Sequence, residues 1–169
     1  MDYSQIPSPC YVLDETAFRK NLELIRTVKE KSGADIILAF KAFAMWKVFP
    51  ILKEYNLNCA AASSLAEAKL AFEELGEKAH TYSPACTEKE FSEITSCSSY
   101  ITFNSIRQFE QFYPQAEKAG ISCGLRINPE YSTVKTALYN PCSAGSRLGM
   151  TADSLGDQLP EEVEGLHFH

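Results

Sequence analysis

Short apolar segments alternate along this chain with segments that have helical periodicity. Five apolar segments of strand length begin about 21 residues apart, and a sixth lies at the end of the sequence. Between them, apolar residues recur at helical spacing, as at Leu65, Ala68 and Phe72. We therefore predict six strands, at residues 36–40, 58–62, 79–82, 100–103, 122–127 and 163–169.

Residues at the starts of the predicted helices have the chemistry of helix caps. Asp14 can cap an amphipathic helix that places Phe18, Leu22 and Ile25 on one face. Ser64 and Thr87 are each followed three residues later by glutamate, the pattern of a capping box. Another helix can begin at Asn104 or Ser105.

Strands that alternate with helices predict an α/β protein with a parallel sheet. The regular spacing, with no glycine-rich turn after the first strand, favours a closed barrel over an open sheet. Six strands are visible where a (β/α)8 barrel has eight, so we expect the N-terminal portion of a TIM-type barrel, truncated after about six strands. Residues 14–169 would form this incomplete domain, and residues 1–13 an extended lead-in.

The segment 129–149 interrupts the alternation and is rich in Ser, Gly, Pro and Asn. An irregular connection of this length inside a compact domain is usually functional. A helix is expected to follow at residues 151–159.

Composition and charge narrow the function classes. The formal net charge of −6 and the unclustered lysines and arginines argue against nucleic-acid binding and favour a cationic small-molecule substrate. The longest apolar stretch, 36–40, is far shorter than the roughly 20 residues that span a bilayer, and residues 1–5 do not resemble a signal peptide. We therefore expect a cytoplasmic protein without membrane contact.

The six cysteines of the chain form no C-x-x-C pair and are expected to be reduced and mostly buried.

Polar residues end every predicted strand. In a parallel barrel these carboxyl ends form the active-site face. The residues at these ends are Lys41, Ser63, Ser64, Tyr82, Asn104, Arg126, Asn128 and His169. We expect Lys41, Tyr82, Arg126 and His169 to open on one rim of the sheet.

Two of these residues have side chains suited to cofactor chemistry. Lys41 lies between Phe40 and Phe43, where partial burial would favour the neutral, nucleophilic amine that a Schiff-base lysine needs. The alternative is a lysine with its ammonium group in water. Arg126, at the end of an apolar strand, needs an anion or an oxygen acceptor, and a structural ion pair is an equally good interpretation.

His167 and His169 flank Phe168, so on a strand both rings point to the same side. An H-x-H pair can bind zinc, but the third histidine, His80, lies near the start of another strand. A role in stacking on a cofactor is therefore favoured, and no metal is expected. Glu67 is explained by its capping position without a functional role.

Several segments, taken together and in order, resemble the alanine-racemase-like, fold-type III decarboxylases. These segments are 7–14, 39–43, 62–67 and 165–169. Within this group, three further segments look most like the carboxynorspermidine (carboxyspermidine) decarboxylases: 125–130, 139–142 and 145–149. The resemblance covers essentially the whole chain.

The resemblance implies a pyridoxal 5'-phosphate-dependent decarboxylase of polyamine biosynthesis. Lys41 would hold the cofactor covalently, His169 would stack on its ring, and Arg126 would lie beside it. The family also has a C-terminal β-domain, which we expect to be absent here, and works as a homodimer when full length. One departure concerns Ala61, because related ornithine and diaminopimelate decarboxylases carry an acidic residue shortly before the serine of the second strand.

Two other interpretations remain open. The chain can belong to a different fold-type III enzyme, such as diaminopimelate decarboxylase or an amino-acid racemase. It can also be a non-catalytic fragment, since the glycine-rich phosphate loop and the acidic partner of the pyridine nitrogen would lie beyond residue 169, and we expect this stretch by itself to be inactive.

Overall fold

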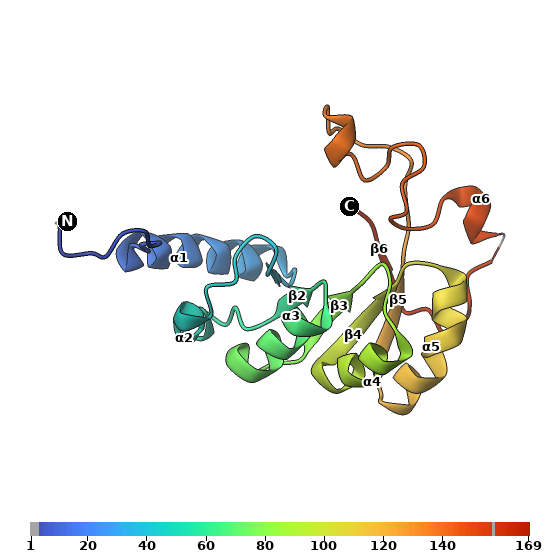
Figure 1. Ribbon diagram of the computed structural model, residues 1–169, viewed down its shortest axis with the longest axis horizontal. Coiled ribbons are helices and arrows are strands. Elements are labelled where there is room, and N and C mark those ends of the chain that lie inside the picture. The colour runs from blue at the N-terminus through green and yellow to red at the C-terminus, as the bar shows by residue number, and fades with distance from the viewer. Residues whose placement is uncertain (1–3, 157) are drawn as a thin grey trace.

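A six-stranded sheet forms the centre of the computed structural model, which describes residues 4–156 and 158–169 (Figure 1). Every pairing is parallel, and the strand order follows the sequence from β1 to β6. The strands are β1 Leu38–Ala39, β2 Ala60–Ala62, β3 Ala79–Tyr82, β4 Ser98–Phe103, β5 Ser122–Arg126 and β6 Gly165–His167. The predicted parallel α/β sheet is confirmed, and it has the form of a half-barrel.

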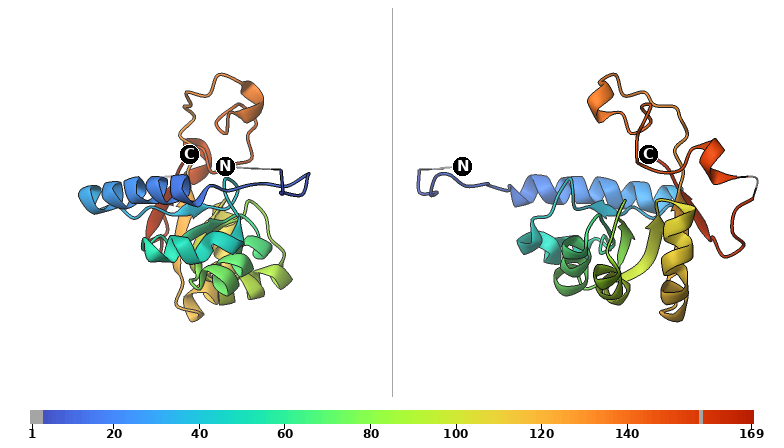
Figure 2. Two further views of the ribbon diagram at one scale, coloured as in Figure 1. Left: turned by 90° about the vertical axis from the view of Figure 1, so that its left-hand side faces the viewer. Right: turned by 45° about the vertical axis from the view of Figure 1, so that its right-hand side comes forward.

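Helices connect the strands, and α3, α4 and α5 lie together on one side of the sheet (Figures 1 and 2). The α-helices are α1 Glu15–Ser32, α2 Phe49–Glu54, α3 Leu65–Leu70, α4 Glu88–Cys97, α5 Ile106–Lys118 and α6 Ala152–Leu155. Shorter helical turns are η1 Trp46–Val48, the π-helical η2 Ala71–Leu75, and η3 Ala137–Tyr139. Because all pairings are parallel, the carboxyl ends of all six strands lie at the same end of the sheet.

The two outer strands are shorter than predicted. β1 has two residues and pairs with β2, while β6 has three and pairs with β5. Each has a single strand partner, so fewer backbone hydrogen bonds hold its ends in the sheet. The ladder between β5 and β6 still continues one residue past the end of β5, where Ile127 N–H donates to the His167 carbonyl at 2.7 Å.

Most of the predicted caps are present. The Asp14 carboxylate accepts a hydrogen bond from Ala17 N–H at 2.9 Å and caps α1, and Thr87 forms the complete capping box of α4. Ser64 caps α3, but the expected capping box is not formed. The Glu67 carboxylate instead accepts from the backbone N–H and the hydroxyl of Ser63, at 2.6 and 2.7 Å.

Two helices differ from the sequence prediction. The pattern did not predict α2, although Pro50 in its first turn is a typical helix-start signal. The helix expected over 151–159 ends at Leu155, because Gly156 adopts a φ of +77° that leaves the helical conformation.

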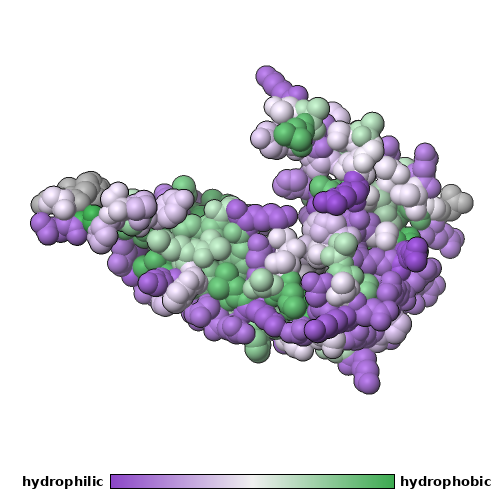
Figure 3. Space-filling view, in the orientation of Figure 1, coloured by the Kyte–Doolittle hydropathy of each residue, from purple (hydrophilic) through white to green (hydrophobic). Residues whose placement is uncertain are grey.

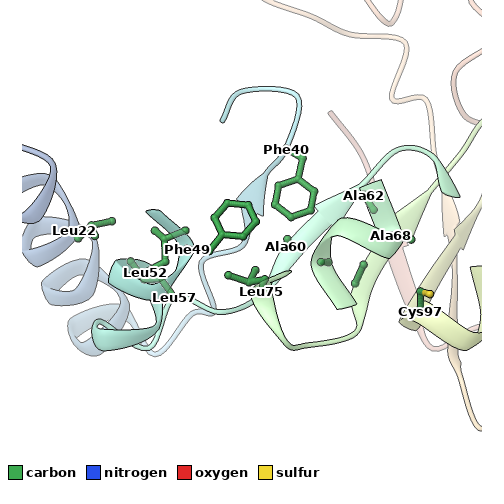
Figure 4. Packing of buried hydrophobic residues seen from close by; sticks show 12 residues of the cluster. Leu22, Phe40, Phe49, Leu52, Leu57, Ala60, Ala62, Ala68, Leu75 and Cys97 are labelled. Carbon is green, nitrogen blue, oxygen red and sulfur yellow. The ribbon is translucent and has the colours of Figure 1, made fainter. Parts of the chain in front are cut away.

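The hydrophobic core has two parts. The first packs α1, α2 and α3 against β1 and β2, and Figure 4 shows the Phe40 and Phe49 rings facing each other at its centre. These rings are stacked with centroids 5.5 Å apart, and Phe49 is fully buried. This packing places the end of β1, and hence Lys41, beside β2.

The second part of the core lies between α4, α5 and the strands β4 and β5. Phe91 is 1% exposed and stacks on Phe112 with centroids 4.3 Å apart, while Phe103 packs against it from β4 at 6.0 Å. Phe109 is also buried here, and Tyr113 packs against the cluster. The predicted assignment of these α5 aromatic residues to the core is confirmed.

The surface of the first half of the chain is more apolar than the rest on the face shown in Figure 3. None of the helices in the described residues is long and apolar enough to cross a membrane.

All six cysteines are free, but only Cys97 and Cys123 are buried and Cys10 is exposed, so the expectation that most are buried was wrong. Burial raises the pKa of the Cys123 thiol to about 11.

Candidate active site

A cavity of about 900 Å³ opens at the carboxyl ends of the strands. This volume is within the range of small-molecule and cofactor sites. Its walls come from β1, β2, β3, β5, β6 and the irregular segment 129–149. The polar residues on these walls are Lys41, Ser63, Tyr82, Arg126, Tyr139, Asn140, Ser143, Ser146, Arg147, His167 and His169.

The structure thus brings Lys41, Tyr82, Arg126 and His169 to one cavity, as the sequence predicted. Ala61 lies in the same wall, at the position where an acidic residue was noted to be missing. Asn104 does not line the cavity but bonds to residues that do, and Asn128 is buried and does not line it either.

Lys41 is exposed, so the partial burial predicted for it is wrong. The chain turns immediately after β1, where Ala42 N–H donates to the Ala39 carbonyl at 2.9 Å. Phe40 enters the core at this turn, whereas the lysine side chain faces the open cavity. It forms no hydrogen bond or ion pair with the residues that the structure describes, and its amine is accessible to a ligand.

Arg126 is 7% exposed and lies at the end of β5. Its guanidinium carbon lies 4.7 Å from the centroid of the Tyr82 ring, a cation–π contact. Its Nε atom is buried and lacks a hydrogen-bond partner among the described residues. A buried charged donor without a partner is costly, so this atom indicates a site for an oxygen acceptor at the cavity wall. The ion pair considered as an alternative is not present among the described residues.

His167 contacts the same aromatic wall. Its ring meets the Tyr82 ring edge-on with centroids 5.2 Å apart. Burial lowers the pKa of His167, and the positive charge of Arg126 lowers it further. Burial raises the pKa of Tyr82, an effect that Arg126 partly opposes. Both side chains are therefore uncharged at neutral pH.

We predict a histidine-dependent loss of stability in mild acid. A histidine titrates near 6.5 in an unfolded chain, and His167 has a lower pKa in the folded protein, so the unfolded state binds the proton more readily. The contribution to stability is complete above about pH 6.5 and is lost as the pH falls through the folded pKa. Urea unfolding from about pH 8 to about pH 5 should show a smaller decline for H167Q than for the wild type.

His80 is the necessary control for that measurement, because burial lowers its pKa too. Its ring stacks on Tyr100 with centroids 4.1 Å apart and does not line this cavity. The double variant H80Q/H167Q should have the shallowest slope. An NMR titration that places the folded pKa of His167 at or above 6.5 would contradict the prediction.

His167 and His169 both line the cavity, although β6 ends at His167 and His169 lies beyond the strand. The Cys142 thiol donates a long hydrogen bond, 3.9 Å, to the His169 carbonyl and links the segment 129–149 to the residues that follow β6. No group of three His, Cys, Asp or Glu side chains in the described residues is arranged to hold a metal ion.

The segment 129–149 forms part of the cavity wall, and the chain returns beside Arg126 at its end. Met150 N–H donates to the Arg126 carbonyl at 2.9 Å, and Asn128 N–H donates to the Met150 carbonyl at 2.7 Å. Gly149 has a φ of +80°, and a Cβ atom on it would lie 2.9 Å from Asn128 N and 3.0 Å from Arg126 Cγ. Only glycine therefore allows this close approach.

Replacing Gly149 with alanine should destabilise the fold more than the same change at Gly145. Gly145 also has a positive φ of +78°, but a Cβ there would meet no atom within 4 Å. We expect about 1–2 kcal/mol for G145A from the backbone conformation alone, and about 1–3 kcal/mol more for G149A from the clash with backbone atoms. Urea unfolding of both variants measures the difference, and equal losses would refute the packing argument.

The charges in the cavity wall differ from those of the whole chain. The net charge is −6, yet the wall carries Lys41, Arg126 and Arg147 and no aspartate or glutamate among the described residues. This part of the site is therefore suited to anionic groups, such as a phosphate or a carboxylate.

The sequence pattern alone did not single out Tyr139, Ser143, Ser146 or Arg147 as site residues. They lie in an irregular segment, where no periodicity indicates which side chains face a cavity. The available signal was the unusual length and composition of the segment 129–149, together with the resemblance of its short motifs.

Comparisons with known proteins found relatives along nearly the whole chain. The chain is 46% identical over 169 residues to the carboxynorspermidine/carboxyspermidine decarboxylase of Campylobacter jejuni, covering 100% of this chain and 44% of the relative. It is 42% identical over 166 residues to the carboxyaminopropylagmatine decarboxylase of Synechocystis, covering 98% of this chain and 43% of the relative. A carboxynorspermidine/carboxyspermidine decarboxylase of Herminiimonas arsenicoxydans is 35% identical, with 97% and 44% covered.

A solved structure shares the fold. The crystal structure of carboxynorspermidine decarboxylase from Campylobacter jejuni, complexed with norspermidine, matches with a TM-score of 0.85 and 42% identity over 97% of this chain and 41% of that chain. The chain thus spans less than half the length of the relatives that it matches. No protein-family model matches the sequence.

Proposed function

Because this chain is a homologue of the carboxynorspermidine/carboxyspermidine decarboxylases over nearly all of its length, we propose that it forms part of a pyridoxal-phosphate-dependent decarboxylase of carboxylated polyamines. The observation that carries the proposal is the cavity at the strand ends, which gathers Lys41, Arg126 and His169. We further propose that residues 14–169 are the barrel part of the enzyme and that residues 1–13 lead into it.

The described residues fit the cofactor. Lys41 supplies the one primary amine among the described residues of the cavity wall and would hold the cofactor covalently. The buried Arg126 Nε atom needs an oxygen acceptor, which a ligand beside it would provide. The imidazole of His169, on the same wall, would pack against the cofactor ring.

Bound pyridoxal phosphate supplies an electron sink for the carbanion left when carbon dioxide departs. The protein binds and orients the reacting groups. Lys41 Nζ, which would hold the cofactor, would also be placed to carry a proton to or from the reacting carbon. Arg126 and Arg147 place positive charge at the wall where anionic groups of cofactor and substrate would bind.

We also propose that the carboxylates that recognise the amines of the substrate come from a second subunit or from residues outside this cavity wall. The proposal is supported by the absence of aspartate and glutamate from the wall among the described residues. An enzyme for cationic substrates needs such groups, because a buried ammonium requires acceptors. A homodimer with the site at its interface would meet this need.

The choice of substrate is tested by measuring carbon dioxide release by the complete gene product. The panel contains carboxynorspermidine, carboxyspermidine, carboxyaminopropylagmatine and diaminopimelate. Carboxyaminopropylagmatine is the second candidate because the Synechocystis relative is 42% identical. Turnover confined to diaminopimelate, or racemisation of an amino acid without carbon dioxide release, would replace our proposal with another fold-type III activity. Absence of any turnover and of cofactor binding would favour a non-catalytic role.

Lys41 is tested separately by borohydride reduction of the cofactor-loaded protein and mapping of the modified peptide. We expect the label on Lys41. A label on Lys47 or Lys53 would contradict the assignment.

A further inference from the structure

Asn104 uses both ends of its side-chain amide to join β3 to the segment 129–149, which lines the cavity. Its Oδ1 atom accepts hydrogen bonds from Tyr82 Oη at 2.7 Å and from Gly149 N–H at 2.8 Å. Its Nδ2 atom donates to the Arg147 carbonyl at 2.9 Å. Because the Gly149 N–H can only donate and the Arg147 carbonyl can only accept, these partners define which end of the amide is oxygen.

The backbone of Asn104 is held as well. Its N–H donates to Gln108 Oε1 at 2.7 Å, and Ser105, the next residue, caps α5. The backbone that carries the amide is therefore fixed by hydrogen bonds at the junction of β4 and α5. A fixed backbone at this junction also fixes the positions that the side-chain amide imposes on its three partners, Tyr82, Arg147 and Gly149.

Two partners of Asn104 contact Arg126 directly. The Tyr82 ring lies against the guanidinium, with 4.7 Å between the ring centroid and the guanidinium carbon. Gly149 passes so close that a Cβ atom on it would be 3.0 Å from Arg126 Cγ. These contacts help to keep Arg126 at 7% exposure with its Nε atom unpaired.

We propose that Asn104 is a positioning residue, which holds Tyr82 and Gly149 against Arg126 and so keeps the guanidinium fixed at the cavity wall for an oxygen acceptor of the ligand. Asn104 itself does not line the cavity. The identity of the ligand rests on the proposed function, whereas the positioning of Arg126 does not. The same amide also fixes the backbone of Arg147 at the cavity edge.

The test compares N104L, N104D and Y82F with the wild type. N104L removes all three side-chain hydrogen bonds. N104D keeps the two accepted bonds but loses the third, because a carboxylate oxygen cannot donate to the Arg147 carbonyl and repels it. Y82F removes one bond and retains the ring beneath Arg126. N58L is the matched control, because the Asn58 amide bonds to Glu77 at 3.1 Å and lies outside this cavity wall.

The first readout is the exchange of the Arg126 Nε–H proton with water, measured by NMR in the ligand-free protein. We expect exchange to accelerate at least about tenfold in N104L, less in N104D and least in Y82F, because a buried donor becomes accessible as its packing loosens. N58L should leave it unchanged. The second readout is the dissociation constant for pyridoxal phosphate, which should rise at least about tenfold in N104L and remain unchanged in N58L.

Unchanged exchange at Arg126 in a folded N104L variant would overturn the proposal, even if the variant is less stable, since a structural role would lower stability alone. If N104L does not fold, the same comparison for Y82F and N104D decides the question. Failure of the wild type to bind pyridoxal phosphate would refute the proposed function and leave the exchange measurement to decide the positioning role.

Discussion

Replacing Lys41 with alanine is expected to reduce carbon dioxide release by the complete gene product at least about a thousandfold, on the order of the loss when other enzymes lose a covalent catalytic group. Lys41 supplies the one primary amine among the described residues of the cavity wall. It is exposed and bonds to no described residue, so the free energy of unfolding should stay within about 0.5 kcal/mol of the wild type. Turnover and urea unfolding of the same preparation separate the two effects.

Two further variants control this prediction. K41R keeps a positive charge but lacks a nucleophilic amine, so it should be nearly as inactive as K41A. K47A removes an exposed lysine that lies over the Trp46 ring and outside the cavity wall, and it should keep wild-type turnover. Substantial activity in K41A, or a comparable loss in K47A, would show that the cofactor lysine has been misassigned.

Replacing Phe91 with alanine is expected to lower the free energy of unfolding by about 3–5 kcal/mol, the usual cost of deleting a buried aromatic ring. Phe91 is 1% exposed and packs between Phe103 and Phe112. The three rings join α4, α5 and β4, so the cavity left by the change lies where both helices meet the sheet. Urea unfolding at 25 °C measures the effect.

The matched control is Phe72, which has the same side chain but is 48% exposed on η2. F72A should cost less than about half of the loss in F91A, because less apolar surface leaves water there on folding. Similar losses in the two variants would mean that the core between α4, α5 and the sheet is not packed as described.

The sequence by itself determined most of the elements and their arrangement in a parallel sheet. The apolar segments at 79–82 and 100–103 became β3 and β4 because an alternating series of strands and helices can bury its apolar residues in few other ways. Asp14, Thr87 and Ser105 became helix caps because capping depends on local hydrogen bonds. Parallel strands alone were enough to predict that Lys41, Tyr82, Arg126 and His169 would share one rim, because the carboxyl ends of such strands lie at the same side of the sheet.

The tertiary structure decided how these side chains are used. The exposure of Lys41 depends on the turn after β1, and the reach of Glu67 to Ser63 depends on how α3 meets β2. The contacts of Asn104 with Arg147 and Gly149 join residues more than 40 positions apart in the sequence. The surroundings of Arg126 arise because an irregular segment folds back over β5, and no local pattern encodes the atoms that such a segment will meet.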